Sequence, residues 1–153
     1  MRISQQLPRF PKKTMFIVTG KQDARFYIAY NDIIERVASF RIRKPNYSDR
    51  EGFRQFTPAG IRGMISGSVL NPVDRAIRLE FRHTIAATAA ALFRLNQIKR
   101  VILFAPRQFI SDTKLSLPKN VQAIITHIIA ANLYESHPFE LIKRYQLTRI
   151  KHL

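Results

Sequence analysis

Short apolar runs separated by polar turns make up the beginning of the chain. Residues 14–19 (TMFIVT) form a continuous apolar run that stops at a glycine, which is typical of a buried strand. Residues 24–30 are rich in aromatic and branched side chains, and residues 33–42 follow directly after an Asn-Asp pair. Three such runs joined by short turns predict an antiparallel meander.

The pattern changes over residues 43–72, which contain several glycines and prolines and show no sustained periodicity. We predict a long loop there, and a loop of that length in a compact domain is usually functional or disordered. Asn71-Pro72 is typical of a helix start. Asp74 would then lie in the first turn, where the helix dipole favours a negative charge.

Residues 73–96 form the clearest predicted helix. Apolar and threonine side chains recur at spacings of three and four and therefore share one face: Ile77, Phe81, Thr84, Ile85, Thr88 and Leu92. The alanine-rich run 86–91 keeps the helix thin enough to lie close to a sheet. Arg75, Arg78 and Arg82 share another face, which indicates that the positive charge is arranged and not merely abundant.

The second half of the chain predicts further strands and helices. Residues 98–105 form a strongly apolar central strand, and residues 107–117 a short connector. Residues 121–131 fit either a strand or a buried helix, because periodicity alone does not separate the two. A last amphipathic helix begins at Pro138, with His137 as its cap, and runs to about residue 146. The order β-β-β-loop-α-β-(α)-β-α predicts an α/β fold with helices packed on a mixed sheet.

The charge balance departs from that of an ordinary domain. Lysine and arginine number 26 against 10 acidic residues, which gives a net charge of +16, while the apolar fraction of 46% excludes wholesale disorder. Self-repulsion at this charge costs stability unless a polyanion neutralises it. The candidate partners are RNA, DNA and an anionic membrane surface. A membrane anchor would need a second signal, and Arg2 stands where myristoylation requires glycine.

Several other classes are excluded by composition. The absence of cysteine excludes a disulfide framework, a thiolate nucleophile and a cysteine-based zinc site. No apolar stretch approaches the roughly 20 residues of a membrane span, and no apolar segment typical of a secretory signal follows the basic N-terminus. We therefore expect a cytoplasmic protein with one α/β domain (residues 14–147), a basic arm (1–13) and a basic tail (148–153).

Basic side chains concentrate in the arm, the long loop, one helix face and the tail, and aromatic residues are interleaved with them in the loop. Arginine can bind a phosphate through two N–H groups, and exposed aromatic rings can stack on unpaired bases. The alternative is a solvated loop whose aromatic residues anchor it to the core. We predict RNA binding by Arg9, Lys12, Lys13, Arg41, Arg43, Lys44, Arg50, Arg54, Arg62, Arg75, Arg78, Arg82, Arg107, Arg149 and Lys151, and a functional loop at Gly60, Arg62, Gly63 and Gly67.

The sequence contains few residues that would support an enzymatic activity. Two-metal nuclease chemistry needs clustered carboxylates, but the first strand has none and Asp23 and Asp32 lie in predicted turns. With only ten acids on the chain, we expect many to be paired with arginines. The histidines show no metal-ligand spacing, and the glycines of residues 60–67 match no phosphate-binding motif. We predict no catalytic residue, no metal and no cofactor.

Two segments resemble a known family. Residues 100–117 (RVILFAPRQFISDTKLSL) resemble the "VLVAPP-x-x-L-x-x-LR" segment of the small bacterial host attachment proteins. Residues 117–144 resemble their segment ending in "DLT-x-HP-x-x-EI", with Asn132-Leu133-Tyr134 and His137-Pro138 at the matching places. That family is similar to the middle domain of archaeal and eukaryotic peptide-release factors and of the ribosome-rescue factor Pelota. The resemblance covers residues 14–147.

The resemblance implies a mixed five-stranded RNase-H-like sheet (β-β-β-α-β-β-α), with a strand over residues 121–129. It also implies that residues 58–68 (PAGIRGMISGS) take the place of the release-factor loop whose Gly-Gly-Gln tripeptide reaches the peptidyl-transferase centre. This chain has no Gly-Gly-Gln, so the resemblance does not imply peptidyl-tRNA hydrolysis.

Charge and resemblance together predict a non-enzymatic RNA-binding protein associated with the ribosome. The expected partners are ribosomal RNA and, as a second RNA, tRNA, in a hibernation, rescue-like or ribosomal-protein role. Two alternatives stay open. One is a host-attachment-type protein of the cell envelope, and the other is a nuclease or hydrolase with a site in the glycine-containing loop.

Overall fold

A computed structural model describes residues 1–43 and 62–151 of the chain, except for the side chains of residues 62–71. Its elements are β1 (Phe10–Thr19), β2 (Asp23–Asn31), β3 (Ile33–Arg41), α2 (Arg62–Asn96), β4 (Arg100–Ala105), the 3-10 helix η3 (Arg107–Phe109), α3 (Ile110–Ser116), α4 (Lys119–Gln122), β5 (Ile125–Ala130) and α5 (Pro138–Lys151). The strands form one five-stranded sheet of order β3-β2-β1-β4-β5. The predicted mixed α/β sheet is confirmed.

The sheet joins an antiparallel meander to a parallel pair. β1 pairs antiparallel with β2, and β2 with β3, as the short polar turns predict. β4 lies parallel to β1, with Thr14 opposite Arg100, and β5 lies parallel to β4. The three parallel strands therefore begin at one edge of the sheet, the amino edge, and end at the opposite carboxyl edge.

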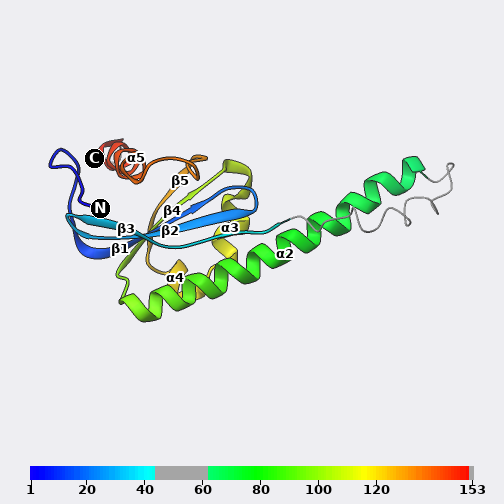
Figure 1. Ribbon diagram of the computed structural model, residues 1–153, viewed down its shortest axis with the longest axis horizontal. Helices are drawn as coiled ribbons and strands as arrows, with labels where there is room; N and C mark the ends of the chain where they lie inside the picture. The colour runs from blue at the N-terminus through cyan, green and yellow to red at the C-terminus, as the bar shows by residue number, and fades with distance from the viewer. Residues whose placement is uncertain (44–61, 152–153) are drawn as a thin grey trace.

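Both faces of the sheet are covered, because side chains alternate between the two sides of each strand. Phe16 and Val18 of β1 pack towards α5 with its Leu141 and Tyr145. The intervening residues of β1 pack towards α2, α3 and α4. Figure 1 shows α5 on one side of the sheet and α2 on the other. This three-layer arrangement explains why β1 and β4 are apolar at consecutive positions.

The predicted apolar face of the long helix is confirmed. Ile77, Phe81 and Ile85 are buried against the sheet, and Ala89 is fully buried in the same cluster. The start of the helix was predicted wrongly. α2 begins at Arg62, so Gly63, Gly67 and Pro72 lie inside it and Asp74 is far from its first turn.

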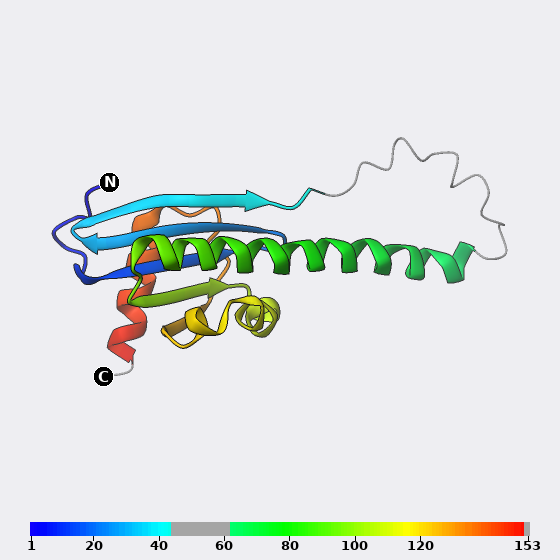
Figure 2. The same ribbon diagram turned by 90° about the horizontal axis from the view of Figure 1, so that it is seen from below.

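The predicted loop 43–72, and with it the functional loop at Arg62, Gly63 and Gly67, is therefore corrected to helix from Arg62 onward. Residues 44–61 lie outside the described residues. Glycine and proline lower helix propensity, but the penalty is local and a helix extended from a packed segment can tolerate it. The N-terminal part of α2 runs beyond the carboxyl edge of the sheet in both views (Figures 1 and 2).

The N-terminal residues are part of the core, which corrects the predicted arm 1–13. Ile3, Leu7 and Phe10 are buried in the cluster under α5, and β1 already begins at Phe10. Asp32, in the β2–β3 turn, accepts a backbone hydrogen bond from Ile3 (2.6 Å) and pairs with Arg2 (3.3 Å). Prolines and basic residues surround these three apolar side chains in the sequence, so the composition predicted an exposed arm. The free energy gained by burying the three side chains favours the packed arrangement instead.

In the C-terminal half, the structure shows whether residues 121–131 form a strand or a helix. Residues 119–122 form the short helix α4, and β5 follows at Ile125–Ala130, so the strand implied by the resemblance is confirmed from residue 125 on. The Phe139 N–H donates to His137 Nδ1 (3.2 Å), which confirms the predicted cap. α5 continues to Lys151, so the predicted tail is helical as far as the structure describes it.

Candidate nucleic-acid interface

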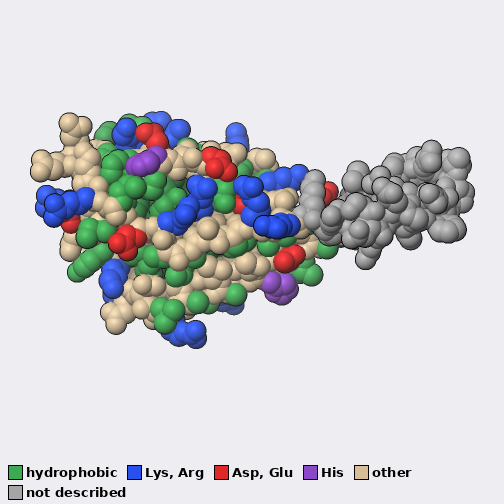
Figure 3. All heavy atoms as spheres, in the orientation of Figure 1, with side chains coloured by type: hydrophobic (Ala, Val, Ile, Leu, Met, Phe, Trp, Pro, Cys, Tyr) green, Lys and Arg blue, Asp and Glu red, His purple; other side chains and the backbone are tan. Residues whose placement is uncertain are grey.

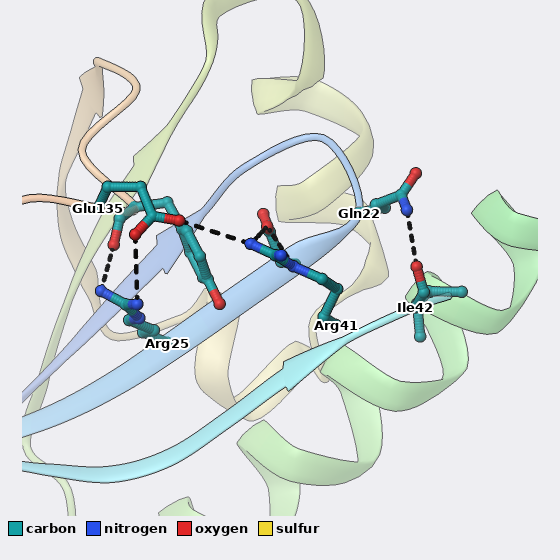
Figure 4. A network of polar contacts seen from close by, with 7 residues as sticks. Gln22, Arg25, Arg41, Ile42 and Glu135 are labelled. Atoms are coloured by element: carbon teal, nitrogen blue, oxygen red, sulfur yellow. Dashed lines mark hydrogen bonds and ion pairs between the residues drawn. The ribbon is translucent and has the colours of Figure 1, made fainter. Parts of the chain in front are cut away.

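A group of charged and aromatic residues lies at the carboxyl edge of the sheet, and we call it the carboxyl-edge network: Asp23, Arg25, Arg41, Tyr134 and Glu135. Asp23 and Arg25 belong to the start of β2, beside the end of β1. Tyr134 and Glu135 lie in the turn between β5 and α5. Figure 4 shows Glu135 between Arg25 and Arg41.

Arg25 is the most embedded cation of this network. Its Nη1 donates to the Tyr134 carbonyl oxygen (2.7 Å), its guanidinium lies 4.3 Å from the centre of the Tyr134 ring, and Nη2 lies 3.5 Å from Glu135 Oε2. Burial lowers the pKa of Arg25, whereas Tyr134 and Tyr27 raise it, and the pKa ends above its ordinary value. Arg25 is therefore always charged and engaged within the protein.

Arg41 occupies the end of β3, where the chain leaves the sheet. Its Nη2 lies 3.1 Å from Asp23 Oδ2 and 3.5 Å from Glu135 Oε1. Beside it, Gln22 Nε2 donates to the Ile42 carbonyl (2.7 Å) and the Ile42 N–H donates back to the Gln22 carbonyl (2.9 Å). Arg41, a predicted RNA-binding residue, is thus paired with two carboxylates. Figure 3 shows basic side chains beside acidic ones on the face of the molecule that it presents.

The arginine stripe of α2 is also partly paired. Arg78 and Arg82 both bind the carboxylate of Asp112 on α3, Arg82 through Nη2 at 2.6 Å, and we call this trio the α2–α3 clasp. Arg78 also donates to the Lys21 carbonyl (3.1 Å) and lies 4.5 Å from the centre of the Phe109 ring. The predicted stripe therefore fastens α3 to α2 through Arg78 and Arg82, whereas Arg75 is exposed and is not part of the clasp.

A different arrangement occurs at the amino edge. A hollow of about 480 Å³ is lined by Lys12, Lys99, Arg100, Thr126, His127, Tyr145 and Arg149, and we call it the amino-edge pocket. Lys12 comes from β1 and Arg149 from the last turns of α5. Arg100 is the first residue of β4, and Lys99 directly precedes it. No described residue that lines it is aspartate or glutamate. Two predicted RNA-binding residues, Lys12 and Arg149, are thus brought together.

Hydrogen bonds and ring contacts organise the pocket. Arg100 Nη1 donates to the Tyr145 hydroxyl (2.8 Å), and Arg149 lies 5.8 Å from the centre of the Tyr145 ring. The His127 ring meets that of Tyr145 edge-on, with centres 4.9 Å apart, and His127 Nδ1 lies 3.0 Å from Thr126 Oγ1. The buried Tyr145 ring therefore connects most of the groups around the pocket.

The other predicted RNA-binding residues are dispersed. Lys13 lies 5.9 Å from the centre of the Tyr30 ring, and Lys151 is the last residue of α5. Of all the predicted RNA-binding residues whose side chains the structure describes, the exposed ones are Arg9, Lys12, Arg41, Arg43, Arg75, Arg82, Arg107, Arg149 and Lys151. Lys44, Arg50, Arg54 and Gly60 lie outside the described residues, and the side chain of Arg62 is not described.

Sequence reasoning missed five pocket residues: Lys99, Arg100, Thr126, His127 and Tyr145. One signal was present, since the basic pair Lys99-Arg100 stands directly before the apolar run 101–105 of β4. A second was the spacing of four between Tyr145 and Arg149 on the last helix. Neither signal shows that Lys12 joins them, because that contact depends on the pairing of β1 with β4.

The acidic residues are mostly engaged in pairs. The expectation that acids pair with arginines is confirmed for Asp23, Asp32, Asp112 and Glu135. Within the described residues, no group of three or more metal-ligating side chains occurs. No described helix is long and apolar enough to cross a membrane.

Comparison with known proteins relates the fold to translation factors. No family model and no curated protein matches the chain. Among solved structures, it is similar to the archaeal translation termination factor aRF1, with a TM-score of 0.51 and 9% identity over 94% of this chain. The chain spans 40% of the length of that factor. The predicted release-factor-like fold is confirmed, whereas the resemblance to host attachment proteins stays a prediction.

Proposed function

We propose that this protein is a non-enzymatic RNA-binding protein that acts in translation in association with the ribosome. The observation that carries the proposal is the fold, which is shared over 94% of the chain with part of a translation termination factor. The net charge of +16 supports it, because ribosomal RNA is a polyanion that relieves this self-repulsion. From the motifs in residues 100–144, we also propose a distant relationship to the host attachment proteins. From the absence of cysteine and of a segment typical of a secretory signal, we propose a cytoplasmic location.

The contacts to RNA would come from basic side chains that the protein does not already use. Arg25, Arg41 and Arg78 bind carboxylates or carbonyls of the protein itself. The pocket cations and the exposed arginines outside these ion pairs, such as Arg9, Arg43, Arg75 and Arg107, remain for phosphate contacts, which supply most of the affinity of a sequence-independent RNA binder. Ribosomal RNA is the proposed main partner, and tRNA is the second.

The proposal assigns no hydrolytic step to this chain. The release-factor tripeptide Gly-Gly-Gln is absent from the sequence, and the carboxylates that a metal nuclease would need are paired with arginines at Asp23 and Asp32. Binding alone would then account for its action, in a hibernation, rescue-like or ribosomal-protein role.

The test is sedimentation of the full chain with ribosomes through a sucrose cushion at 50, 100 and 200 mM KCl. If six to ten phosphates are contacted, affinity should fall about 10³–10⁵-fold over this range. A parallel pull-down from lysate should lose its partners after RNase treatment. Absence of sedimentation at 50 mM salt, or binding that ignores salt and RNase, would contradict the proposal.

A further inference from the structure

The amino-edge pocket gathers cations from three separate segments of the chain. Lys12, Lys99, Arg100 and Arg149 all line it, and no described carboxylate does. A backbone hydrogen bond from Lys99 N–H to the Lys13 carbonyl (3.0 Å) holds the segment before β4 against β1. Since like charges held around one hollow repel each other, the arrangement is stabilised by any anion that enters it.

The pocket is built on rigid groups. Tyr145 is 1% exposed, and its ring packs on Phe10 at 5.9 Å and on Phe16 at 6.3 Å. The Tyr145 hydroxyl accepts from half-buried Arg100, so the guanidinium is positioned before any ligand arrives. Its remaining N–H groups keep their capacity to donate. A positioned donor loses less conformational entropy on binding than a free surface side chain.

The donor set matches the chemistry of phosphate. Guanidinium groups present paired N–H donors that fit two phosphate oxygens, and lysines add compact positive charge. Thr126 and His127 supply polar groups on the β5 wall. The hollow of about 480 Å³ lies within the range of roughly 300–1,000 Å³ that is typical of sites for organic ligands. It therefore has room for a group larger than inorganic phosphate.

We propose that the amino-edge pocket binds a phosphate-bearing ligand of nucleotide size, with Arg100 and Arg149 as its phosphate-binding side chains. Tyr145 is a positioning residue, because it acts on the ligand by holding Arg100. The phosphate would belong either to a free nucleotide or to the 5′ end of an RNA chain. This inference goes beyond the proposed function, since it rests on the pocket alone and requires no ribosome.

Isothermal titration calorimetry of the full chain at 50 mM KCl tests the proposal with pyrophosphate, ADP and an RNA 8-mer carrying a 5′ phosphate or a 5′ hydroxyl. We expect pyrophosphate to bind. Tighter binding of ADP than of pyrophosphate identifies a free nucleotide, and a preference for 5′-phosphorylated over 5′-hydroxyl RNA identifies a chain end. Both results support the site, whereas failure of pyrophosphate and ADP to bind overturns it.

Two variants of α5 with the same charge change locate the site. Arg149→Gln should weaken pyrophosphate binding about tenfold, as expected for a lost charge-assisted contact. The control Arg144→Gln removes an exposed charge outside the pocket lining and should change affinity by no more than about twofold. Equal losses in the two variants would overturn the proposal.

Two further variants keep the test independent of folding and of ribosome binding. Arg100→Lys keeps the charge and loses the paired donors, and Tyr145→Phe releases the guanidinium, so both should weaken pyrophosphate binding. Unchanged affinity in both, with unfolding midpoints in urea like that of the parent, would contradict the assigned roles. Ribosome sedimentation of Arg149→Gln separates the two proposals. If the variant loses pyrophosphate binding but still sediments with ribosomes, the pocket is a phosphate site that ribosome association does not require.

Discussion

The two ends of the sheet carry similar basic side chains in opposite electrostatic surroundings. At the carboxyl edge, Arg25 and Arg41 both contact Glu135, and Arg41 also contacts Asp23. At the amino edge, four cations line one hollow without a described carboxylate. The net charge of a protein therefore does not show where on its surface a polyanion binds. Cations already bound to acids hold the fold together, and cations without such partners are available to a ligand.

Topology explains why the ends differ. The carboxyl edge lies where the turn after β5 approaches β2, so Glu135 of that turn meets Arg25 and Arg41 of the meander. The amino edge joins the beginnings of β4 and β5 to the end of α5, and the residues that meet there are mainly basic. The cations therefore divide into a structural set at the carboxyl edge and a binding set at the amino edge.

The largest stability effect is expected for Arg25→Met. The change removes the hydrogen bond to the Tyr134 carbonyl and the stacking on its ring. We expect a loss of about 2 kcal/mol in the free energy of unfolding, measured in urea. Pyrophosphate affinity should stay within about twofold of the parent, because the residue is remote from the pocket. A variant as stable as the parent would mean that the carboxyl-edge network is not structural.

A smaller effect is expected at the α2–α3 clasp. Asp112→Asn leaves Arg78 and Arg82 without their shared carboxylate, and we expect a loss of about 1 kcal/mol in the free energy of unfolding. The effect should shrink at high salt, since Arg82 is half exposed. RNA affinity, measured by fluorescence anisotropy, should rise, because Arg78 and Arg82 lose their carboxylate partner and become available to phosphate. A fall in RNA affinity would show that the clasp itself forms part of the binding surface.

The smallest effect is expected for the exposed ion pair of α5. Lys143 Nζ lies 3.2 Å from Glu140 Oε1, and more than half of each side chain is exposed. Lys143→Gln should lower the free energy of unfolding by about 0.3 kcal/mol and leave pyrophosphate binding unchanged. Because Arg149 lies on the same helix, a clear loss of pyrophosphate affinity here would argue that the helix as a whole attracts the anion, and not the pocket.

Much of the fold could be predicted from local sequence. The apolar runs of β1, β2 and β3, the buried face of α2 at Ile77 and Phe81, and the cap at His137 all follow from patterns within a few residues. The start of α2 could not be predicted, because Gly63, Gly67 and Pro72 are typical of loops and the helix continues through them. Burial of Ile3 and Leu7 was hidden by the basic residues around them.

The candidate site was less predictable than the fold. Charge counting singled out Arg41, Arg78 and Arg82, but their carboxylate partners lie on other elements, and Asp112 is 30 residues from Arg82 in sequence. The pocket joins Lys12 to Lys99 through the register of two parallel strands that are far apart in the chain. Such contacts are set by tertiary pairing, and neither composition nor periodicity contains them.

The central claim is that the position of a cation, and not the net charge, decides whether it binds RNA. The most direct test compares Lys99→Gln/Arg149→Gln with Arg41→Gln/Arg82→Gln, since each pair of changes lowers the net charge of +16 by two. Affinity for a fluorescent single-stranded RNA would be measured from 50 to 200 mM KCl. The pocket variant should bind RNA more weakly. The slope of its log affinity against log salt concentration should be reduced by about 1.4 for two lost phosphate contacts, while the affinity and slope of the paired-arginine variant stay near those of the parent. Equal losses of affinity and slope in the two variants would contradict the account.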